Sequence, residues 1–170
     1  MKGIILHQSK YGATKKYVDW LIDTTRYHCL ETKKAAILAI VQYDVIILAG
    51  GIYASGIAGL SFLKKNIDNL KGKQIAVFCV GASPFDEDAF KQICEHNFKD
   101  SLQGIPCFYG RGAWNESAMT LRDRTCVRCF RSCCQKEPST YEPWEKALMC
   151  AVGQSCDWTD KAYLRPLFNG

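Results

Sequence analysis

The sequence predicts an α/β protein in which a five-stranded parallel sheet of order 2-1-3-4-5 lies between two layers of helices. Short, almost continuously apolar runs alternate along the chain with segments of helical spacing, and strands that are buried on both faces are apolar in this way. Repeated strand–helix–strand units form right-handed crossovers and a parallel sheet. Glycine and hydroxyl residues follow three of the runs, at the edge where such sheets bind ligands.

The expected strands and helices follow from these patterns. The apolar runs, interpreted as strands, cover residues 2–7, 28–31, 44–50, 74–81 and 105–110. Helical spacing of apolar residues predicts helices over residues 14–25, 58–70 and 89–102. The sequence "DWTDKAYLRPLF" offers Thr159 or Asp160 as a cap and is expected to hold the last helix.

Length and composition limit the organisation of the chain. With 170 residues, of which 48% are hydrophobic, it can bury one sizeable core, and we expect a single domain over residues 1–170. The opening "MKGIILHQ" lacks the long apolar stretch of a secretory signal, and no segment reaches membrane-spanning length, which favours a cytoplasmic protein. The net charge of +5 is modest and widely spread, so no nucleic-acid partner is expected.

The stretch "HQSKYGATKKYV", residues 7–18, joins the first expected strand to the first expected helix. Such a join leaves the first N–H groups of the helix unsatisfied and directs them, with the positive end of the helix dipole, at one spot. Ser9, Thr14 and the backbone between Lys10 and Thr14 can therefore hydrogen-bond a phosphate, and Gly12 permits the tight turn. The alternative interpretation is an ordinary capped turn with Thr14 near the N-cap.

Two further loops, "GGIYASG" and "GASPFDED", follow the third and fourth expected strands. The first surrounds one aromatic residue, Tyr53, with glycine and serine. The second places small residues, Gly81 to Ser83, before a proline, so its backbone is approachable. Because parallel strands end at one edge of the sheet, the three loops are expected to converge on one crevice. Taken alone, Tyr53 is equally an ordinary half-buried tyrosine, and "GASP" an ordinary turn.

These loops carry a resemblance to a known family. "SKYGAT", residues 9–14, resembles the phosphate loop of flavodoxins, usually Ser/Thr-x-Ser/Thr-Gly-x-Ser/Thr, and the match extends from Met1 to about Tyr109. The layout is most similar to the flavodoxin-domain group that includes menaquinone-dependent protoporphyrinogen oxidase, because both have a basic residue in the phosphate loop, here Lys10, and a long segment before the last helix. The departures are Tyr11 at the middle hydroxyl position and ring loops without surrounding acidic residues.

The resemblance implies a flavodoxin-like three-layer αβα sandwich with a helical insertion at about residues 111–157, and FMN as the cofactor. Tyr53 would lie against one face of the flavin ring, and the backbone of the third loop would donate to its pyrimidine edge. The residues implied to bind FMN are Ser9, Lys10, Tyr11, Gly12, Ala13, Thr14, Ile52, Tyr53, Ala54, Gly81, Ala82 and Ser83. No acid or base is singled out, since His7 is equally explained by packing at a strand end.

Rival phosphate-binding classes are excluded by specific residues. The chain has no G-x-x-x-x-G-K-S/T loop and no G-x-G-x-x-G after the first strand, so neither nucleoside-triphosphate hydrolysis nor dinucleotide binding of those types is indicated. A response-regulator receiver needs an acidic cluster after the first strand and an aspartate ending the third. Those strands end here in "LHQS" and "LAGG".

The segment from Glu116 to Glu137 is expected to be an amphipathic basic helix. Its apolar face carries Met119, Cys126, Phe130 and Cys133, and the opposite face carries Arg124, Arg128 and Arg131. The plain interpretation is a solvated face over a packed one. The alternative is contact of the arginine stripe with an acidic partner or a membrane surface. A second helical piece is expected in "YEPWEKALMCAVGQ".

Ten cysteines are expected to be reduced, because disulfide frameworks belong to short secreted chains. Four of them, Cys126, Cys129, Cys133 and Cys134, invite a metal hypothesis. Their spacing continues a helix without the glycine or proline turns that let sulfurs converge, so no bound metal is expected. A redox pair at Cys126 and Cys129 stays open.

Two functional classes follow. The first is an FMN-dependent oxidoreductase that acts on a quinone or a small aromatic or porphyrin-type substrate, and the second is a non-enzymatic electron carrier. A carrier that meets basic partners presents an acidic rim. This chain has arginines after the last expected strand instead, at positions 111, 122, 124 and 128, so the sequence favours the enzyme.

Overall fold

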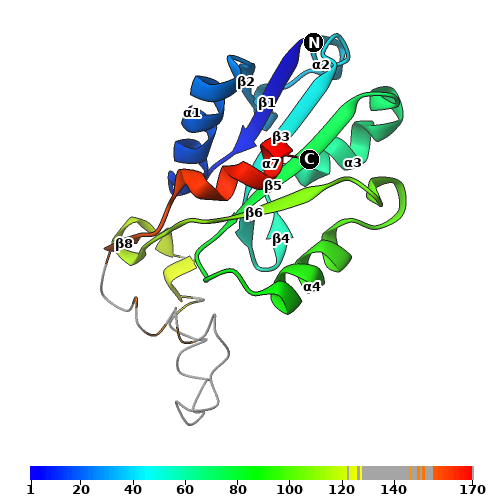
Figure 1. Cartoon of the computed structure of the whole chain (residues 1–170). Coiled ribbons are helices and arrows are strands. Elements are labelled where there is room, and N and C mark those ends of the chain that lie inside the picture. Colours follow the sequence, from blue (N-terminus) through cyan, green and yellow to red (C-terminus); the bar gives the residue numbers. More distant parts are fainter. Residues whose placement is uncertain are drawn as a thin grey trace.

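The computed structural model has a sheet of six strands, five of which are parallel and lie side by side (Figure 1). It describes residues 1–121, 123–125, 127, 146, 149, 151 and 155–169. The parallel strands, in sheet order, are β2 (His28–Glu31), β1 (Gly3–Gln8), β3 (Val45–Tyr53), β5 (Gln74–Gly81) and β6 (Cys107–Arg111). The short β4 (Gly56–Ile57) pairs antiparallel with the end of β3, outside this row. The predicted order 2-1-3-4-5 is therefore confirmed.

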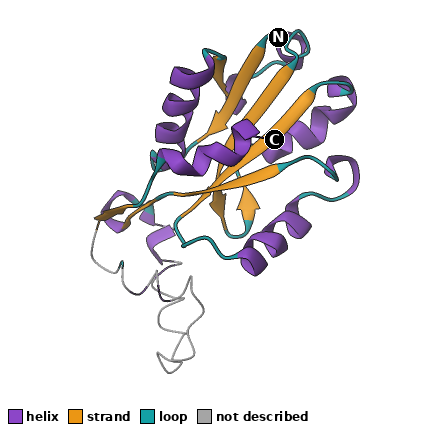
Figure 2. Ribbon diagram, viewed as in Figure 1, coloured by secondary structure: helices purple, strands orange, loops and turns teal. Residues whose placement is uncertain are grey.

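Helices cover both faces of the sheet, which gives three layers (Figure 2). On one side lie α1 (Ala13–Thr25) and α7 (Arg165–Asn169), and on the other lie α3 (Leu60–Asn66) and α4 (Glu87–Asn97). A one-turn helix, α2 (Ile37–Ile40), precedes β3. Short 3₁₀ turns complete the layers: η1 (Thr32–Lys34), η2 (Ile67–Leu70), η3 (Asp100–Leu102), η4 (Glu116–Ala118) and η6 (Lys161–Leu164).

The period of two along each strand divides the core between the two faces. On β1, Ile5 packs with Tyr17 and Leu21 of α1, whereas its neighbour Leu6 packs with Leu63 of α3 on the other side. All five side chains are fully buried. Because each strand is apolar on both faces, the sheet accepts helices on both sides.

Several predicted boundaries shift for local reasons. β3 runs to Tyr53, beyond the expected end at residue 50, because its last residues pair with β4 in a hairpin. The helix expected at 58–70 begins only at Leu60, since Gly59 takes a left-handed φ of 85° as its N-cap. The helix expected at 89–102 ends at Asn97, because Phe98 leaves helical dihedral angles.

The expected basic helix does not start at Glu116. Residues 116–118 form the turn η4, and Met119 is extended, so Met119 does not lie on a helical face. Helix resumes at residue 121, where the Thr120 hydroxyl accepts the N–H of Asp123 as an N-cap does. The missed signal is the spacing Thr120-x-x-Asp123, a capping-box pattern.

The ends of the insertion pair with each other. β7 (Ala113–Asn115) and β8 (Ser155–Asp157) form a two-stranded antiparallel sheet that the sequence did not indicate. The second predicted helical piece and the four clustered cysteines lie outside the described residues, apart from Lys146 and Met149, which are helical, and Ala151, which is a buried turn residue. After β8, the Asp160 carboxylate accepts the N–H of Ala162, which confirms Asp160 as a cap.

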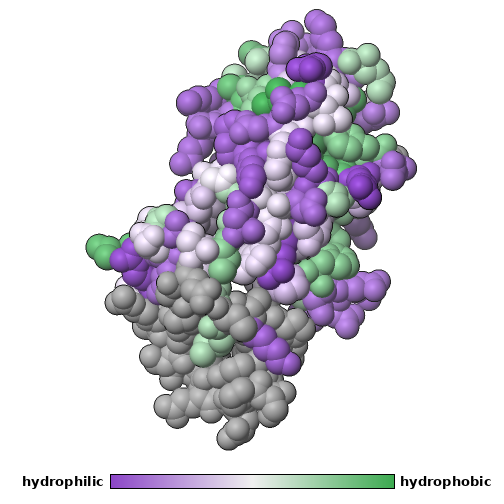
Figure 3. Space-filling view, turned by 60° about the vertical axis from the view of Figure 1, so that its left-hand side comes forward, coloured by the Kyte–Doolittle hydropathy of each residue, from purple (hydrophilic) through white to green (hydrophobic). Residues whose placement is uncertain are grey.

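In the described part of the chain, no helix has both the length and the apolar character that crossing a membrane requires. On the face shown in Figure 3, hydrophilic and hydrophobic residues are interspersed, which agrees with the wide spread of charge in the sequence.

The Tyr17 hydroxyl joins three separate segments. It donates to the backbone carbonyl of Arg111 at 2.6 Å and accepts the N–H of Asp160 at 3.2 Å, inside a core where Tyr17 is fully buried. Burial raises the pKa of this phenol to about 12, so it remains protonated and can donate. The bond thus fastens the end of β6 and the start of η6 to α1.

We expect Tyr17→Phe to lower the free energy of unfolding by about 1 to 3 kcal/mol, because it leaves a buried carbonyl and N–H without their partner. Chemical denaturation measures the change. Tyr27→Phe is the control, since the Tyr27 hydroxyl bonds no described residue, and an equal loss in both variants would contradict this role for the Tyr17 hydroxyl.

A second link joins α1 to β8. The Asp157 carboxylate lies 2.8 Å from the Lys16 ammonium and accepts from the Thr159 hydroxyl, and these bonds hold its pKa at about 2, below the ordinary 3.8. A carboxyl whose folded pKa is depressed stabilises the fold above its unfolded pKa and loses that contribution as the pH falls through the folded value.

We therefore expect the stability difference between the native chain and Asp157→Asn to be present at pH 5 and to shrink between about pH 4 and pH 2. Thermal melts across this range measure it. The pair is half exposed, so the difference is small. A difference that stays constant down to pH 2 would show that the charge of Asp157 does not contribute.

Candidate functional site

The loop between β1 and α1 has the backbone that the phosphate hypothesis requires. Gly12 is the N-cap of α1, with a left-handed φ of 92°, and its N–H donates to the Ser9 hydroxyl at 3.2 Å. A Cβ placed on Gly12 would meet no atom within 4 Å, so the space in front of the turn is open. Thr14 lies in the first turn of α1 and is buried, and is not the N-cap.

The amino terminus of α1 receives no negative partner from its own turn. No side chain caps it, and its first turn has no acidic residue. α4 differs, because Asp86 caps it and Glu87 and Asp88 follow. Unsatisfied N–H groups with the positive end of the helix dipole favour an anion at the start of α1. The residues of this loop therefore fit a phosphate group.

A pocket of about 390 Å³ adjoins this loop on the side of β2. Its lining residues include Ser9, Gly12 and the charged Lys15, Glu31 and Lys33. His7 also lines it and is 8% exposed, and its Nδ1 has no hydrogen-bond partner in the described chain. Burial and the Lys15 charge lower the His7 pKa, so the ring is neutral at pH 7. The positive charge near the loop thus comes from lysines.

The second loop is a β-hairpin. Its two turn residues, Ala54 and Ser55, have φ angles of 47° and 66°, a left-handed pair that hairpins usually assign to glycine or asparagine. Asn97 of α4 holds the turn, since its amide donates to the Ser55 carbonyl at 2.7 Å and accepts the N–H of Ile57 at 3.2 Å. Strain of this kind persists where surrounding contacts fix it, and it concentrates at functional loops.

Tyr53 connects the second loop to the first. Its hydroxyl accepts the backbone N–H of Lys10 at 3.2 Å, and the ring folds back over Gly51, where an added Cβ would lie 2.6 Å from the hydroxyl. The Tyr11 ring meets it edge-on at 6.1 Å. One of the N–H groups expected to hold phosphate, that of Lys10, is therefore engaged by Tyr53.

The third loop lies against the second, and the carbonyls of its first three residues are engaged. A Cβ placed on Gly81 would lie 3.3 Å from the Ile52 side chain. The carbonyls of Gly81, Ala82 and Ser83 accept from the Gly112 N–H, the Arg111 guanidinium and the Tyr109 hydroxyl. The N–H groups of Ala82 and Ser83 donate to no described residue, which leaves them for a ligand.

The structure therefore brings the twelve predicted residues together at the carboxyl edge of the sheet. Lys10 and Tyr53 join the first two loops, and Ile52 and Gly81 join the second to the third. Ala13 and Ala54 lie at the helix start and the hairpin turn. Their part in binding stays a prediction.

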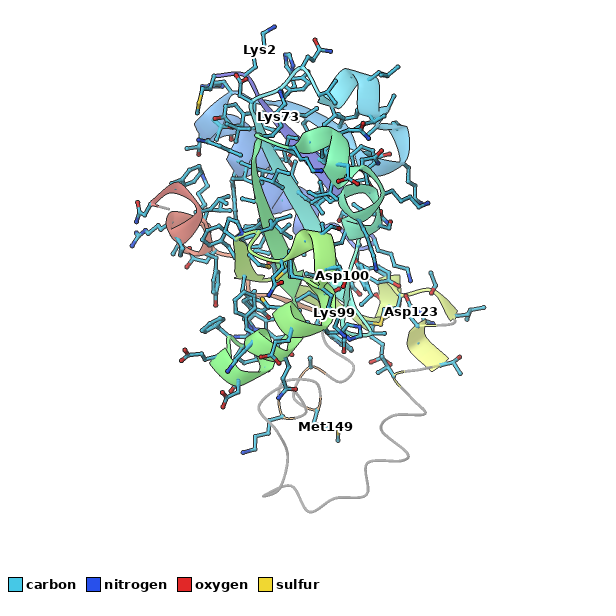
Figure 4. All side chains as sticks on the ribbon, turned by 90° about the vertical axis from the view of Figure 1, so that its right-hand side faces the viewer. Lys2, Lys73, Lys99, Asp100, Asp123 and Met149 are labelled. Atoms are coloured by element: carbon cyan, nitrogen blue, oxygen red, sulfur yellow. The ribbon has the colours of Figure 1, made fainter. Side chains whose placement is uncertain are left out.

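Asp123, which the sequence did not single out, reaches the phosphate loop from the segment after β7. Its carboxylate pairs with the Lys10 ammonium and accepts from the Tyr11 hydroxyl, and the hydrogen bond from Lys10 lowers the pKa of Asp123. Figure 4 shows Asp123 at the opposite end of the molecule from Lys2 and Lys73, which precede β1 and β5. The insertion thus contacts the loop at the carboxyl edge.

The arginine stripe is only partly described. Arg124 donates to the carbonyls of Glu116, Ser117 and Met119, so its guanidinium closes the η4 turn. Arg128 and Arg131 lie outside the described residues, as do the cysteines at 126, 129, 133 and 134. Contact of the stripe with a membrane or an acidic partner stays a prediction. The Arg124 guanidinium is bonded to backbone carbonyls of its own segment. Within the described ranges, no group of three possible metal ligands occurs.

Aromatic residues beside the third loop were also missed. Phe85, which is 53% exposed, lies 5.7 Å from Phe90 and 5.8 Å from Tyr109 between ring centroids. The sequence signal was the aromatic residue after Pro84 in "GASPF". This cluster gives the loop an apolar flank next to the free N–H groups.

The chain was compared with protein families and with proteins of known structure. A family model described as a flavodoxin domain matches residues 4–140. No curated protein matches the sequence. Among solved structures, the chain is similar to the Trp repressor binding protein of Bacillus subtilis, with a TM-score of 0.50 and 16% identity over 65% of this chain and 85% of that one.

The chain is also similar to two more solved structures. The flavodoxin of Megasphaera elsdenii is 18% identical, with a TM-score of 0.48 over 65% of this chain and 83% of that one. A flavoprotein of Lactobacillus acidophilus, solved in complex with FMN, is 15% identical, with a TM-score of 0.45 over 65% and 91%.

We expect Thr14→Val to weaken FMN binding by about 1 to 3 kcal/mol, because it removes a hydroxyl donor beside the phosphate and leaves an oxygen unpaired. Fluorescence titration with FMN measures the change. Thr24→Val on the same helix is the matched control, since its hydroxyl bonds only the Trp20 carbonyl. Equal affinities in the two variants would remove Thr14 from the site.

Proposed function

Because the chain belongs to the flavodoxin-domain family, we propose that it is an FMN-dependent oxidoreductase that acts on a quinone or a small aromatic or porphyrin-type substrate. The cofactor is FMN. Support comes from the loop between β1 and α1, whose uncapped helix terminus, left-handed Gly12 and open front suit a phosphate. Five described cysteines are free thiols, which suits a reducing compartment such as the cytoplasm.

FMN supplies the redox chemistry, and the chain binds and orients it. The start of α1 would hold the phosphate, with Ser9 and Thr14 as hydroxyl donors. The N–H groups of Ala82 and Ser83 would bind the polar edge of the ring. The left-handed hairpin would form the opposite wall, with Tyr53 as its aromatic residue.

The sign of the charge around the three loops favours an enzyme over an electron carrier. Arg111 lies against the third loop without a carboxylate partner in the described chain, whereas Lys10 and Lys15 at the first loop pair with Asp123 and Asp19. A carrier that docks on basic partners needs the opposite sign, because complementary charges steer such encounters. A basic rim instead attracts anionic or electron-rich substrates.

One observation favours the carrier. The first turn of α4, directly after the third loop, carries Glu87 and Asp88, and exposed Phe85 precedes them. An acidic group next to an exposed aromatic residue is suited to docking a basic redox protein. The carrier is therefore retained as the alternative function.

Steady-state turnover separates the two functions. The FMN-loaded protein is assayed with NADH or NADPH as reductant, first with a water-soluble quinone and then with cytochrome c as a one-electron acceptor. We expect sustained quinone reduction that saturates with quinone concentration.

Rapid cytochrome c reduction that falls in Glu87→Gln with Asp88→Asn, without quinone turnover, would establish the carrier instead. The visible absorbance of the purified protein provides the preceding control. A colourless protein that takes up no FMN on reconstitution would contradict both functions.

A further inference from the structure

We propose that the Arg111 guanidinium is a fixed positive charge that stabilises the reduced form of FMN in this protein. This inference rests on the proposed function, because it needs FMN in the site at the three loops. According to this inference, a residue outside those loops influences the reduction potential of the bound FMN through its charge.

Arg111 is placed beside the third loop by backbone pairing. It ends β6, where it lies opposite Gly81 in the parallel ladder, and the next residue, Gly112, donates its N–H to the Gly81 carbonyl at 2.7 Å. Its own carbonyl accepts the Tyr17 hydroxyl at 2.6 Å. The backbone of Arg111 is thus fixed from two sides, one of them the loop that offers free N–H groups.

The side chain is held at the same loop. Its Nε lies 3.4 Å from the Ala82 carbonyl, and its Cζ lies 4.2 Å above the Trp158 ring, so a cation–π contact supports the guanidinium from the other side. Trp158 is fixed in turn, because its backbone N–H donates to the Gly112 carbonyl at 3.1 Å. The remaining N–H groups of Arg111 donate to no described residue.

Two nearby cations are already neutralised or engaged, in contrast to Arg111. Lys10 pairs with the Asp123 carboxylate, and Arg124 donates to three backbone carbonyls of its own segment. Arg111 has one neutral carbonyl and an aromatic ring as partners in the described chain. No described carboxylate pairs with the Arg111 guanidinium, so its positive charge is not neutralised by a direct ion pair.

The effect of this charge follows from the balance of the reduction. Two electrons from a reductant and one proton from solvent convert the neutral oxidised ring into a reduced ring with one net negative charge. A cation that is already fixed beside the ring stabilises that product more than the neutral starting form, and it needs no rearrangement to do so. Arg111 should therefore raise the reduction potential of bound FMN.

The test is a spectroscopic redox titration of the FMN-loaded protein with dithionite. We expect Arg111→Met to lower the preference for reduced over oxidised FMN about tenfold, which is about 30 mV for a two-electron couple. Arg111→Lys keeps the charge and should retain most of the native potential. Arg26→Met is the matched control, since Arg26 ends α1 at the opposite edge of the sheet and loses the same charge.

Salt provides a second measurement on the native protein, which stays informative if the methionine variant does not fold. The potential should fall as ionic strength rises, because the Debye length shrinks from about 30 Å at 0.01 M to about 3 Å at 1 M. The Arg26→Met variant should show the same fall as the native protein, and Arg111→Met a smaller one.

Equal potentials in the native protein, Arg111→Met and Arg26→Met would overturn the inference while leaving the proposed function intact. A native potential that does not change with salt would also count against it. Failure of the native protein to bind FMN is a different result, since it would remove the proposed function itself.

Discussion

The unsatisfied amino terminus of α1 is the constraint around which the carboxyl edge of this sheet is organised. Its N–H groups have no side-chain cap and no acidic residue in the first turn, although α4 has both. Gly12 gives the turn the left-handed angle that opens this terminus to the outside, and the buried Tyr17 and Thr14 hold the helix to the sheet behind it. The other two loops then close around a point of positive potential.

Different charged groups lie at the loop proposed to bind the phosphate and at the loop proposed to meet the flavin ring. A phosphate at this site would depend on the backbone of α1, because the Lys10 ammonium is shared with Asp123 and the Lys10 N–H with Tyr53. The flavin ring would meet the third loop, where the carbonyls of residues 81–83 are engaged and Arg111 lies beside them. Affinity and redox behaviour can therefore be set by different residues.

The sequence predicted the sheet well because its strands are buried on both faces, which leaves a continuous apolar signal at residues such as Ile46 to Leu48. It located the open, uncapped turn before α1 because glycine and hydroxyl residues stand at that strand-to-helix join, while phosphate binding there stays a prediction. The hairpin after β3 was missed, since Ala54 and Ser55 do not mark a left-handed turn by type, and tertiary bonds from Asn97 impose it. Asp123 and Arg111 were not assigned to the site because their positions depend on pairing far along the chain.

The pairing of β7 with β8 has a consequence for how this chain can change in evolution. The two strands bring residues 113–115 and 155–157 into register, so the two ends of the intervening segment lie side by side. The entropy of closing such a loop grows only as the logarithm of its length, and doubling it costs about 0.6 kcal/mol. A change in the length of this segment therefore adds little to the entropy of closing it between β7 and β8. A descendant could acquire a different substrate or partner at this point while inheriting the same nucleotide-binding half.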